Sequence, residues 1–177
     1  MSAIKHPLEQ FKYCPKCGSD QFLDNNFKSK RCAHCGFVYY FNSCASTVGL
    51  IFNQKGELLV ATRAHEPSKG TYDLPGGFVD MYETGEEAMK REIKEETNLD
   101  VVGLKYLFSV PNTYVYSGFE VHTLDMVFEC QVDDFSSMRA EDDVNKLNFI
   151  CRENLNPNEF GLLSIKGIIK KLKEKEL

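Results

Sequence analysis

The sequence has no long hydrophobic run and no export signal. None of its apolar stretches approaches the roughly 18 residues that a membrane helix needs, and the opening MSAIKHPLEQFKYC has no apolar core. We therefore expect a cytoplasmic protein that does not insert into a membrane. In that reducing compartment the seven cysteines are expected to form no disulfide framework.

Positive charge is scarce in most of the chain. Residues 1–40 hold six Lys or Arg against three Asp or Glu, whereas residues 41–177 hold fifteen against twenty-three. An acidic domain of this kind disfavours nonspecific binding of nucleic acid, although an acidic site loaded with cations still takes phosphate groups. The chain also has no internal repeat, low-complexity tract or long linker.

Two pairs of cysteines with the same spacing stand near the N-terminus. Each pair has two residues between its cysteines and a glycine after the second, and fourteen residues separate the pairs, which are Cys14 with Cys17 and Cys32 with Cys35. Four thiolates in two such turns suit a closed tetrahedral zinc site with no open position for catalysis. The alternatives are two disulfides or four incidental thiols. We expect a structural zinc ribbon over residues 1–40 and a second domain over residues 41–177. A module as small as the ribbon needs a bound metal to stabilise its fold.

The second domain begins with patterns typical of strands. CASTVGLIFN and ELLVATRA, separated by QKG, predict a β-hairpin. From Val101 to Val132 strand-like segments alternate with turn signals at PN and SG, and KLNFI predicts one more strand. GLLSIKGIIKKLKEKEL has apolar residues at helical spacing and predicts an amphipathic helix. Cys44, Cys130 and Cys151 lie in apolar, strand-like surroundings and are expected in the core.

A short acidic helix is predicted near the middle of the chain. The run Thr84-Gly85-Glu86-Glu87 has the pattern of a capping box, so the helix should begin at Thr84. Asn98 tolerates the left-handed conformation that ends helices. The helix should therefore end near this residue.

One face of this helix gathers three glutamates. Each helical residue turns 100°, so Glu92, Glu95 and Glu96 fall within a sector of about 100°. Clustered carboxylates suit Mg²⁺, which commonly shares them with substrate phosphates. The alternative is a solvated acidic face. Just before the helix, Gly76 and Gly77 allow backbone to approach a ligand closely.

These residues carry a resemblance to a known family. Gly77, five residues, Glu83, seven residues, and then REIKEETNL from Arg91 are similar to the signature of the Nudix hydrolases. The departure is Asn98, where the family carries glycine. The resemblance covers about residues 44–170 and implies an α+β fold, a Nudix α/β/α sandwich with a mixed sheet, preceded here by the small zinc ribbon.

The resemblance also implies an activity and roles for the matching residues. Glu92, Glu95 and Glu96 would hold Mg²⁺ or Mn²⁺, and Arg91 and Glu83 would brace the loop against the helix. The implied reaction is attack of water on a diphosphate linkage, giving a nucleoside monophosphate and a second phosphorylated fragment. A homodimer is expected from the resemblance alone.

One further acidic residue is a candidate for the reaction. Nudix enzymes often use another acid outside the signature as metal ligand or general base. In AEDDVNKLNFI we select Asp143 by its offset from the following strand. An ordinary acidic turn is the alternative.

The order of ribbon and Nudix domain is similar to that of the NADH pyrophosphatases and of related enzymes acting on ADP-ribose or flavin dinucleotides. The NADH enzymes carry SQPWPFPxS after the signature, and this chain has SVPNTYVYS, in which Asn112-Thr113 replaces Trp-Pro. We expect a dinucleotide-like substrate without strict NADH preference. Aromatic residues in this loop region suit stacking of a base, so the predicted substrate contacts, besides the glycine pair, are Phe108, Ser109 and Tyr114. The alternative is that these aromatics face the core of a strand.

Two other classes of function compete with hydrolysis. One is a nucleotide-sensing Nudix domain that binds without cleaving, and retention of all three signature glutamates disfavours it. The other is a zinc-ribbon protein that binds RNA, which the acidic main domain disfavours.

Overall fold

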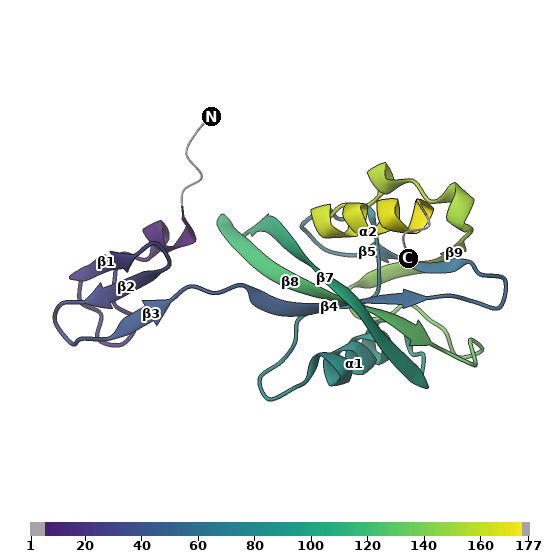
Figure 1. The fold of residues 1–177 in the computed structure, drawn as a ribbon, viewed down its shortest axis with the longest axis horizontal. Coiled ribbons are helices and arrows are strands. Elements are labelled where there is room, and N and C mark those ends of the chain that lie inside the picture. The colour runs from purple at the N-terminus through teal and green to yellow at the C-terminus, as the bar shows by residue number, and fades with distance from the viewer. Residues whose placement is uncertain (1–5, 175–177) are drawn as a thin grey trace.

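The computed structural model describes residues 6–174, which form a small three-stranded module followed by a larger domain (Figure 1). The module contains a short 3₁₀ helix and an antiparallel sheet of order β1-β2-β3. Their bounds are η1 Pro7–Gln10, β1 Phe22–Asn26, β2 Ser29–Cys32 and β3 Val38–Tyr40. The buried core of the module is small and consists of Cys14, Phe22 and Cys32, with aromatic side chains packed around it.

The larger domain is built on two three-stranded sheets. The first has the order β4-β8-β7, with β4 parallel to β8 and β7 antiparallel to it; the second has the order β6-β5-β9 and is antiparallel throughout. The bounds are β4 Cys44–Ile51, β5 Leu58–Arg63, β6 Tyr72–Asp73, β7 Gly103–Tyr116, β8 Phe119–Gln131 and β9 Val144–Ile150. The helices are α1 Gly85–Thr97 and α2 Leu163–Lys173, with 3₁₀ turns η2 Arg152–Asn154 and η3 Pro157–Glu159 before α2.

The two helices cover opposite faces of the sheets (Figure 1). Leu58 and Val60 of β5 share a buried cluster with Ile168 of α2, whereas the intervening Leu59 packs in the cluster that contains Ile93 of α1. Because successive strand residues point to opposite faces, a strand covered on both faces is apolar at every position. The α/β/α arrangement with a mixed sheet is therefore confirmed.

The ends of α1 also match their prediction. Thr84 accepts a hydrogen bond from the Glu87 backbone N–H, and the Glu87 carboxylate accepts one from the Thr84 N–H at 2.8 Å. Asn98 ends the helix in the left-handed conformation, with φ of 56°. The C-terminal helix forms as α2, and the last residues of that predicted segment lie outside the described part of the chain. Among the described residues, no helix has the length and apolar character to cross a membrane.

Two local predictions are wrong. The segments CASTVGLIFN and ELLVATRA do not form a paired hairpin, because β4 and β5 belong to different sheets. They are joined by one antiparallel bridge between Phe52, which follows β4, and Leu58. The PN pair, Pro111 and Asn112, lies inside β7 and not in a turn. As β7 is at the edge of its sheet, a proline there breaks no ladder on a central strand.

The remaining cysteines differ in burial. Cys130 is buried as expected and Cys151 is partly buried, but Cys44 is exposed at the start of β4. Its prediction as a core residue is wrong because the first two residues of β4 are still exposed, and the strand is buried only from Ser46 on.

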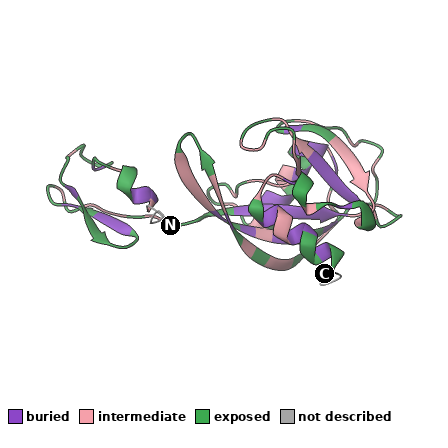
Figure 2. Ribbon diagram, turned by 90° about the horizontal axis from the view of Figure 1, so that it is seen from above, coloured by how far each residue is buried: buried purple, intermediate pink, exposed green. Residues whose placement is uncertain are grey.

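The long hairpin of β7 and β8 extends toward the N-terminal module, and much of its tip is exposed (Figure 2). Phe119, just after the turn, packs against Phe11 and Phe41 with ring centroids 5.7 and 5.9 Å apart. Gln10 Nε2 donates to the Gly118 carbonyl at 3.2 Å. The module is thus attached to the hairpin by aromatic contacts as well as by the chain.

Candidate active site

The glycine pair lies in the segment after β6, and this segment runs beside β4. The Thr47 N–H donates to the Gly77 carbonyl at 2.8 Å, and the Gly49 N–H donates to the Pro75 carbonyl at 2.7 Å. Gly76 has a φ of 146°, and an added Cβ would lie 2.1 Å from the Thr47 carbonyl oxygen. Only glycine fits this position.

The same pair contacts the acidic helix. A Cβ on Gly77 would lie 2.5 Å from Oε1 of Glu92. The Gly76 N–H donates to Oε2 of Glu96 at 2.9 Å. The loop before α1 and the glutamate face of α1 are therefore packed directly against each other.

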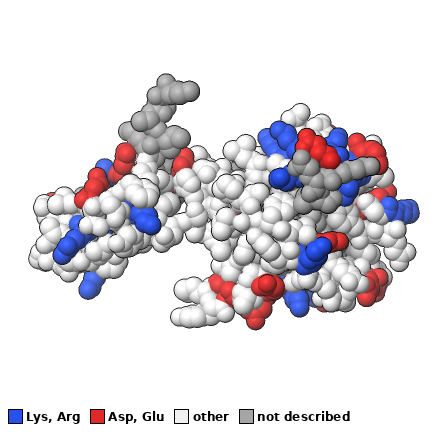
Figure 3. Space-filling model, viewed as in Figure 1, with Lys and Arg blue, Asp and Glu red and all other residues white. Residues whose placement is uncertain are grey.

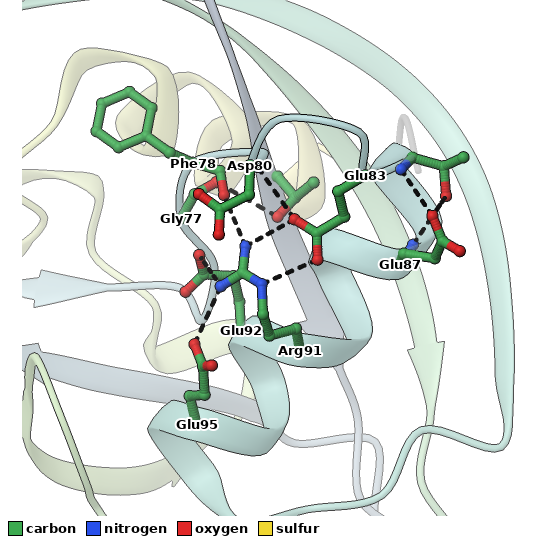
Figure 4. A network of polar contacts seen from close by, with 10 residues as sticks. Gly77, Phe78, Asp80, Glu83, Glu87, Arg91, Glu92 and Glu95 are labelled. Carbon is green, nitrogen blue, oxygen red and sulfur yellow. Dashed lines mark hydrogen bonds and ion pairs between the residues drawn. The ribbon is translucent and has the colours of Figure 1, made fainter.

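A single guanidinium connects the acidic residues, as Figure 4 shows. Arg91 donates to both oxygens of Glu83 at 2.9 Å, and its Nη1 contacts Glu92 at 2.9 Å and Glu95 at 3.0 Å. Its Nη2 also donates to the Phe78 carbonyl at 3.0 Å. Arg91 thus ties the loop to the helix and offsets the repulsion between neighbouring glutamates.

Glu96 is the buried member of the glutamate face. It is 8% exposed, and the Gly76 N–H is the one hydrogen-bond donor recorded for its carboxylate among the described residues. Burial raises its pKa well above the usual range for glutamate, and the charges of Asp73, Glu92 and Asp143 raise it further. This arrangement of carboxylates favours a cation nearby.

A pocket of about 570 Å³ lies beside this helix and the hairpin. That volume is typical of sites for small ligands. Five of the predicted site residues line it, namely Gly76, Gly77, Glu96, Tyr114 and Asp143. The helix residue, the glycine loop and the hairpin therefore face one common space.

The other predicted site residues lie outside this lining. Glu83, Arg91, Glu92 and Glu95 form the ion-pair network between α1 and the loop before it. Phe108 packs against the core cluster beneath α2, and Ser109 is exposed on β7. The aromatic stretch predicted as a loop region is strand for nearly its whole length.

The pocket also contains polar residues that were not selected from the sequence. Arg63 forms an ion pair with Asp73, and Asp125 accepts hydrogen bonds from three hydroxyl groups. Asn112 has a buried amide oxygen without a hydrogen-bond partner in the described part of the protein. Asp125 was not detectable from the strand pattern, because the alternation in HTLDMVF places Leu124, Met126 and Phe128 on the apolar face and Asp125 on the other face.

Asp143 stands at the rim of the pocket and close to a histidine. Its Oδ1 lies 3.6 Å from Nε2 of His65, and both side chains are exposed, by 71% and 68%. His65 also lines the pocket. An exposed carboxylate beside an imidazole is suited to receive a proton from water.

The four cysteines of the N-terminal module converge. Their sulfur atoms all lie within 4.8 Å of one another, with Cys14 to Cys35 and Cys17 to Cys32 both at 3.7 Å. A tetrahedral zinc with bonds of about 2.3 Å requires sulfurs about 3.8 Å apart. The donor set and its spacing therefore fit zinc. Within residues 6–174 this is the one group of three or more such side chains at that spacing.

Comparison with known proteins gives the family. Residues 43–169 match the model of the NUDIX domain. The protein named NAD-capped RNA hydrolase NudC of Haemophilus influenzae is 34% identical over 110 residues, which are 61% of this chain and 41% of that protein. The protein of the same name from Vibrio cholerae is 26% identical over 152 residues, covering 86% of this chain and 54% of that protein. The matches thus span about half, or less, of these relatives' own length.

Solved structures agree on the fold. A NUDIX hydrolase from Nitrosomonas europaea has a TM-score of 0.71 at 19% identity, covering 93% of this chain and 92% of its own. The NUDIX domain of Shewanella oneidensis NrtR, solved with ADP ribose, has a TM-score of 0.60 at 16% identity, with 78% and 91% covered. With its acidic helix, its glycine loop and a domain match over residues 43–169, the chain belongs to the Nudix family.

Proposed function

We propose that the protein is a metal-dependent hydrolase that cleaves the diphosphate linkage of a nucleoside diphosphate derivative, such as ADP-ribose, FAD or an NAD(H)-like dinucleotide. The observation that carries this proposal is the single pocket shared by Glu96, the glycine pair and Tyr114. A carboxylate face beside an aromatic wall suits a ligand that has both phosphates and a base. The products are a nucleoside monophosphate and a phosphorylated fragment.

The glutamates of α1 are the residues that would hold Mg²⁺ or Mn²⁺. Glu92, Glu95 and Glu96 offer the hard oxygen ligands that these ions prefer, and Glu96 is buried among other carboxylates with one recorded donor. When bound, the cation draws charge from the phosphate oxygens and lowers the pKa of water. Arg91 and Glu83 are positioning residues, because they bind each other through both carboxylate oxygens and so hold the glutamates of α1 against the glycine loop.

Asp143 is the proposed proton acceptor. It lines the pocket rim, is exposed to water and lies beside His65. A carboxylate in that position accepts a proton from the attacking water, and the neighbouring imidazole can take up that proton in turn. Because Gly76 and Gly77 have no side chains, their backbone lies directly against Thr47 of β4 and Glu92 of α1, which holds the loop beside the glutamates.

We also propose that residues 1–40 are a ribbon with one structural zinc. Support comes from the sulfur spacing and from the small core of the module. A sheet of three short strands with so few buried apolar residues is only marginally stable in its folded form unless a metal ion or another cross-link holds it together. The four thiolates would fill the coordination sphere, so this zinc takes no part in the hydrolysis.

A product-resolved screen tests the activity. The full chain is incubated with ADP-ribose, NADH, NAD, FAD and dinucleoside polyphosphates, each with Mg²⁺ and with Mn²⁺, and the products are separated. We expect AMP from at least one ADP-linked compound. Binding without any product would identify a nucleotide-sensing domain instead, and hydrolysis of simple nucleoside triphosphates alone would contradict the substrate class.

A capped RNA belongs in the same screen. The relatives from Haemophilus and Vibrio are named as hydrolases of NAD-capped RNA. The ribbon of this chain exposes Phe27 by 82% and Tyr13 by 67%, which would suit stacking of unpaired bases. However, Lys and Arg are interspersed with Asp and Glu on the face of the ribbon seen in Figure 3, so we favour the free dinucleotide. A large preference for an NAD-capped oligonucleotide over NAD would reverse that order.

We infer a cytoplasmic homodimer as the working form. The reduced thiols required by the zinc site support the compartment, and the likeness to the NADH pyrophosphatase branch supports the dimer. Light scattering of the purified chain and fractionation of cells test the two statements separately.

A further inference from the structure

We propose that the pocket selects ligands by an –NH₂ group carried on a planar ring, either an exocyclic amine or a carboxamide, which Asn112 and Asp125 recognise together. The inference rests on the proposed function, since it assumes that a nucleotide occupies the pocket. The inference specifies which group of the ligand is recognised and which residues recognise it. The residues concerned are Ser46, Asn112, Thr123 and Asp125, all buried and all lining the pocket, and together they are called the polar wall.

The polar wall is continuous across three neighbouring strands. Ser46 of β4 is the register partner of Asp125 of β8, and Asn112 of β7 is the register partner of Thr123 of β8. Residues two apart on a strand share a face, so Thr123 and Asp125 point to the same side. Asn112 is therefore a diagonal neighbour of Asp125, a separation that lies within reach of one planar ligand group.

Asp125 accepts hydrogen bonds from the three hydroxyl groups around it. Its Oδ1 accepts from Ser46 Oγ and Thr123 Oγ1, both at 2.5 Å. Its Oδ2 accepts from Ser164 Oγ at 2.6 Å, from behind the polar wall. An ionised carboxyl has about four acceptor positions, so one remains on Oδ2. Because the hydroxyl hydrogens point at Asp125, Ser46 and Thr123 present lone pairs to any further group.

Asn112 adds an acceptor that none of the described residues satisfies. The residue is 5% exposed, and its Oδ1 has no hydrogen-bond partner within residues 6–174. A buried polar atom left without a partner is costly, and native proteins rarely keep one except where a ligand or ion is expected. A donor brought into the pocket removes that cost.

The chemistry of the polar wall therefore favours a donor and disfavours a carbonyl. An –NH₂ group gives its two hydrogens to acceptors such as Asn112 Oδ1 and Asp125 Oδ2. The Asn112 amide hydrogens remain for a ring nitrogen or carbonyl beside that amino group, as in the paired contacts that asparagine makes with adenine. Hypoxanthine has an oxygen in place of the amino group, and that oxygen would face lone pairs. Two sources share the required chemistry, the adenine ring and the carboxamide of nicotinamide.

The same strand supplies a stacking surface. Tyr114 and Tyr116 follow Asn112 at intervals of two, so all three point to one face of β7, and all three line the pocket. A ring held against these tyrosines presents its edge, not its face, to the polar wall. Edge recognition and stacking then act on the same ring.

The test compares matched substrates that differ at one group. The first comparison, called the adenine arm, measures kcat/KM for ADP-ribose and for its hypoxanthine analogue. The second comparison, called the nicotinamide arm, measures kcat/KM for NAD and for nicotinic acid adenine dinucleotide. We expect at least about a tenfold preference for the amino compound in one arm, because a hydrogen bond is lost and an acceptor stays unpaired. The arm that shows the preference identifies the ring. Equal values in both arms would overturn the inference.

Variants connect the preference to the residue. Asn112→Leu removes the amide at similar volume and should reduce the preference to less than about threefold, mainly by slowing the amino substrate. Thr113→Val is the matched control, since Thr113 is next to it on the opposite face of β7 and bonds to His122. The control should keep the preference of the unchanged protein. An Asn112→Leu variant that keeps the full preference would also overturn the inference.

A binding measurement separates this inference from the proposed activity. Calorimetry of the full chain with AMP and with IMP needs no turnover. Tighter binding of AMP that disappears in Asn112→Leu supports recognition of the amino group even if no diphosphate is cleaved. Failure of every substrate in the screen contradicts the hydrolase, whereas equal AMP and IMP affinity, together with no preference in the nicotinamide arm, contradicts the recognition. If Asn112→Leu lowers stability, the same comparison of AMP and IMP binding is made with Asn112→Ser.

Discussion

Arg91 and Glu83 form a two-point ion pair across eight residues of chain, with Nε to Oε1 and Nη2 to Oε2 both at 2.9 Å. Glu83 precedes the helix and Arg91 lies within it, so the pair fixes the angle at which the glycine loop meets α1. Bidentate pairs of this kind have little freedom to rearrange. Glu83 also accepts the Asp80 N–H at 3.0 Å, which extends the same support into the loop.

This pair should make stability depend on pH in a specific window. The Arg91 guanidinium lowers the pKa of Glu83 below its usual range, with help from the Asp80 N–H. A depressed pKa gives stability that is present above the unfolded pKa of about 4.3 and is lost as pH falls through the folded value. The difference in free energy of unfolding between the unchanged protein and Glu83→Gln should therefore be largest near pH 7 and shrink below about pH 4.

Denaturant unfolding at several pH values measures this difference. Glu86→Gln is the matched control, because Glu86 is exposed in the first turn of the same helix. Its difference should stay small throughout. A Glu83→Gln difference that is constant from pH 7 to pH 3 would show that the ion pair does not contribute as described.

Gly77→Ala should reduce turnover more than stability. The added Cβ would lie 2.5 Å from Oε1 of Glu92, whose carboxylate is also held by Arg91. The glutamate must move, and a displacement of about 1 Å at a catalytic group costs up to about a hundredfold in rate. Gly167→Ala in α2 is the control, since no atom lies within 4 Å of its added Cβ. The control should keep its activity and gain about 0.5–1 kcal/mol of stability.

Much of the fold was predictable because it depends on local patterns. The capping box at Thr84, the left-handed residue Asn98 and the apolar spacing of α2 each act within one or two turns of helix. The cysteine spacing likewise reports a local turn geometry, and the sulfurs converge as expected. The pairing of β4 was not predictable in this way, because each of its residues pairs with a residue of β8 that lies 79 positions later in the chain.

In the site, too, the residues found from the sequence lie in a local pattern, and the residues that were missed depend on contacts distant in the chain. The glutamate face and the glycine loop were found from one continuous segment of sequence. Asn112 and Asp125 were missed because their importance appears only when β7, β8 and β4 are placed side by side. Asn112 was even assigned to a turn, since PN is a common turn pair, and the edge position of β7 overrode that preference.

The ribbon should contain one zinc per chain as purified. Cys32→Ser should lower the zinc content and unfold the module, because metal binding there supplies much of the folding energy and Cys32 is part of its small core. Elemental analysis and thiol titration measure the two effects. Cys44→Ser is the matched control, as Cys44 is exposed and lies outside the cluster. Native protein without zinc, with all four ribbon thiols freely titratable, would contradict the prediction.

Glu96→Gln should keep the fold and lose activity. The amide oxygen still accepts the Gly76 N–H, while the charge needed by a cation is removed. We expect a loss of at least about a hundredfold in kcat, since this is the typical scale for losing a charged ligand of a catalytic metal. Removing a buried charge should leave the melting temperature equal or higher. Near-normal activity at saturating Mg²⁺ would show that Glu96 is not part of the catalytic site.

Tyr114→Ala should weaken substrate binding with little change in the chemical step. Tyr114 lines the pocket and is partly buried, and burial raises the pKa of its hydroxyl above the usual range. A base stacked on this ring contributes about 1–3 kcal/mol. Because stacking away from the phosphorus stabilises the bound substrate and the transition state alike, the loss should appear in KM and not in kcat. Val115→Ala is the control, since Val115 is 63% exposed on the opposite face of β7. Steady-state kinetics with the preferred ADP-linked substrate measure both constants. A Tyr114→Ala protein that loses stability but keeps its KM would show that this ring packs in the hairpin and does not stack on the substrate. Tyr116, the other tyrosine on the same face, would then be the candidate for stacking.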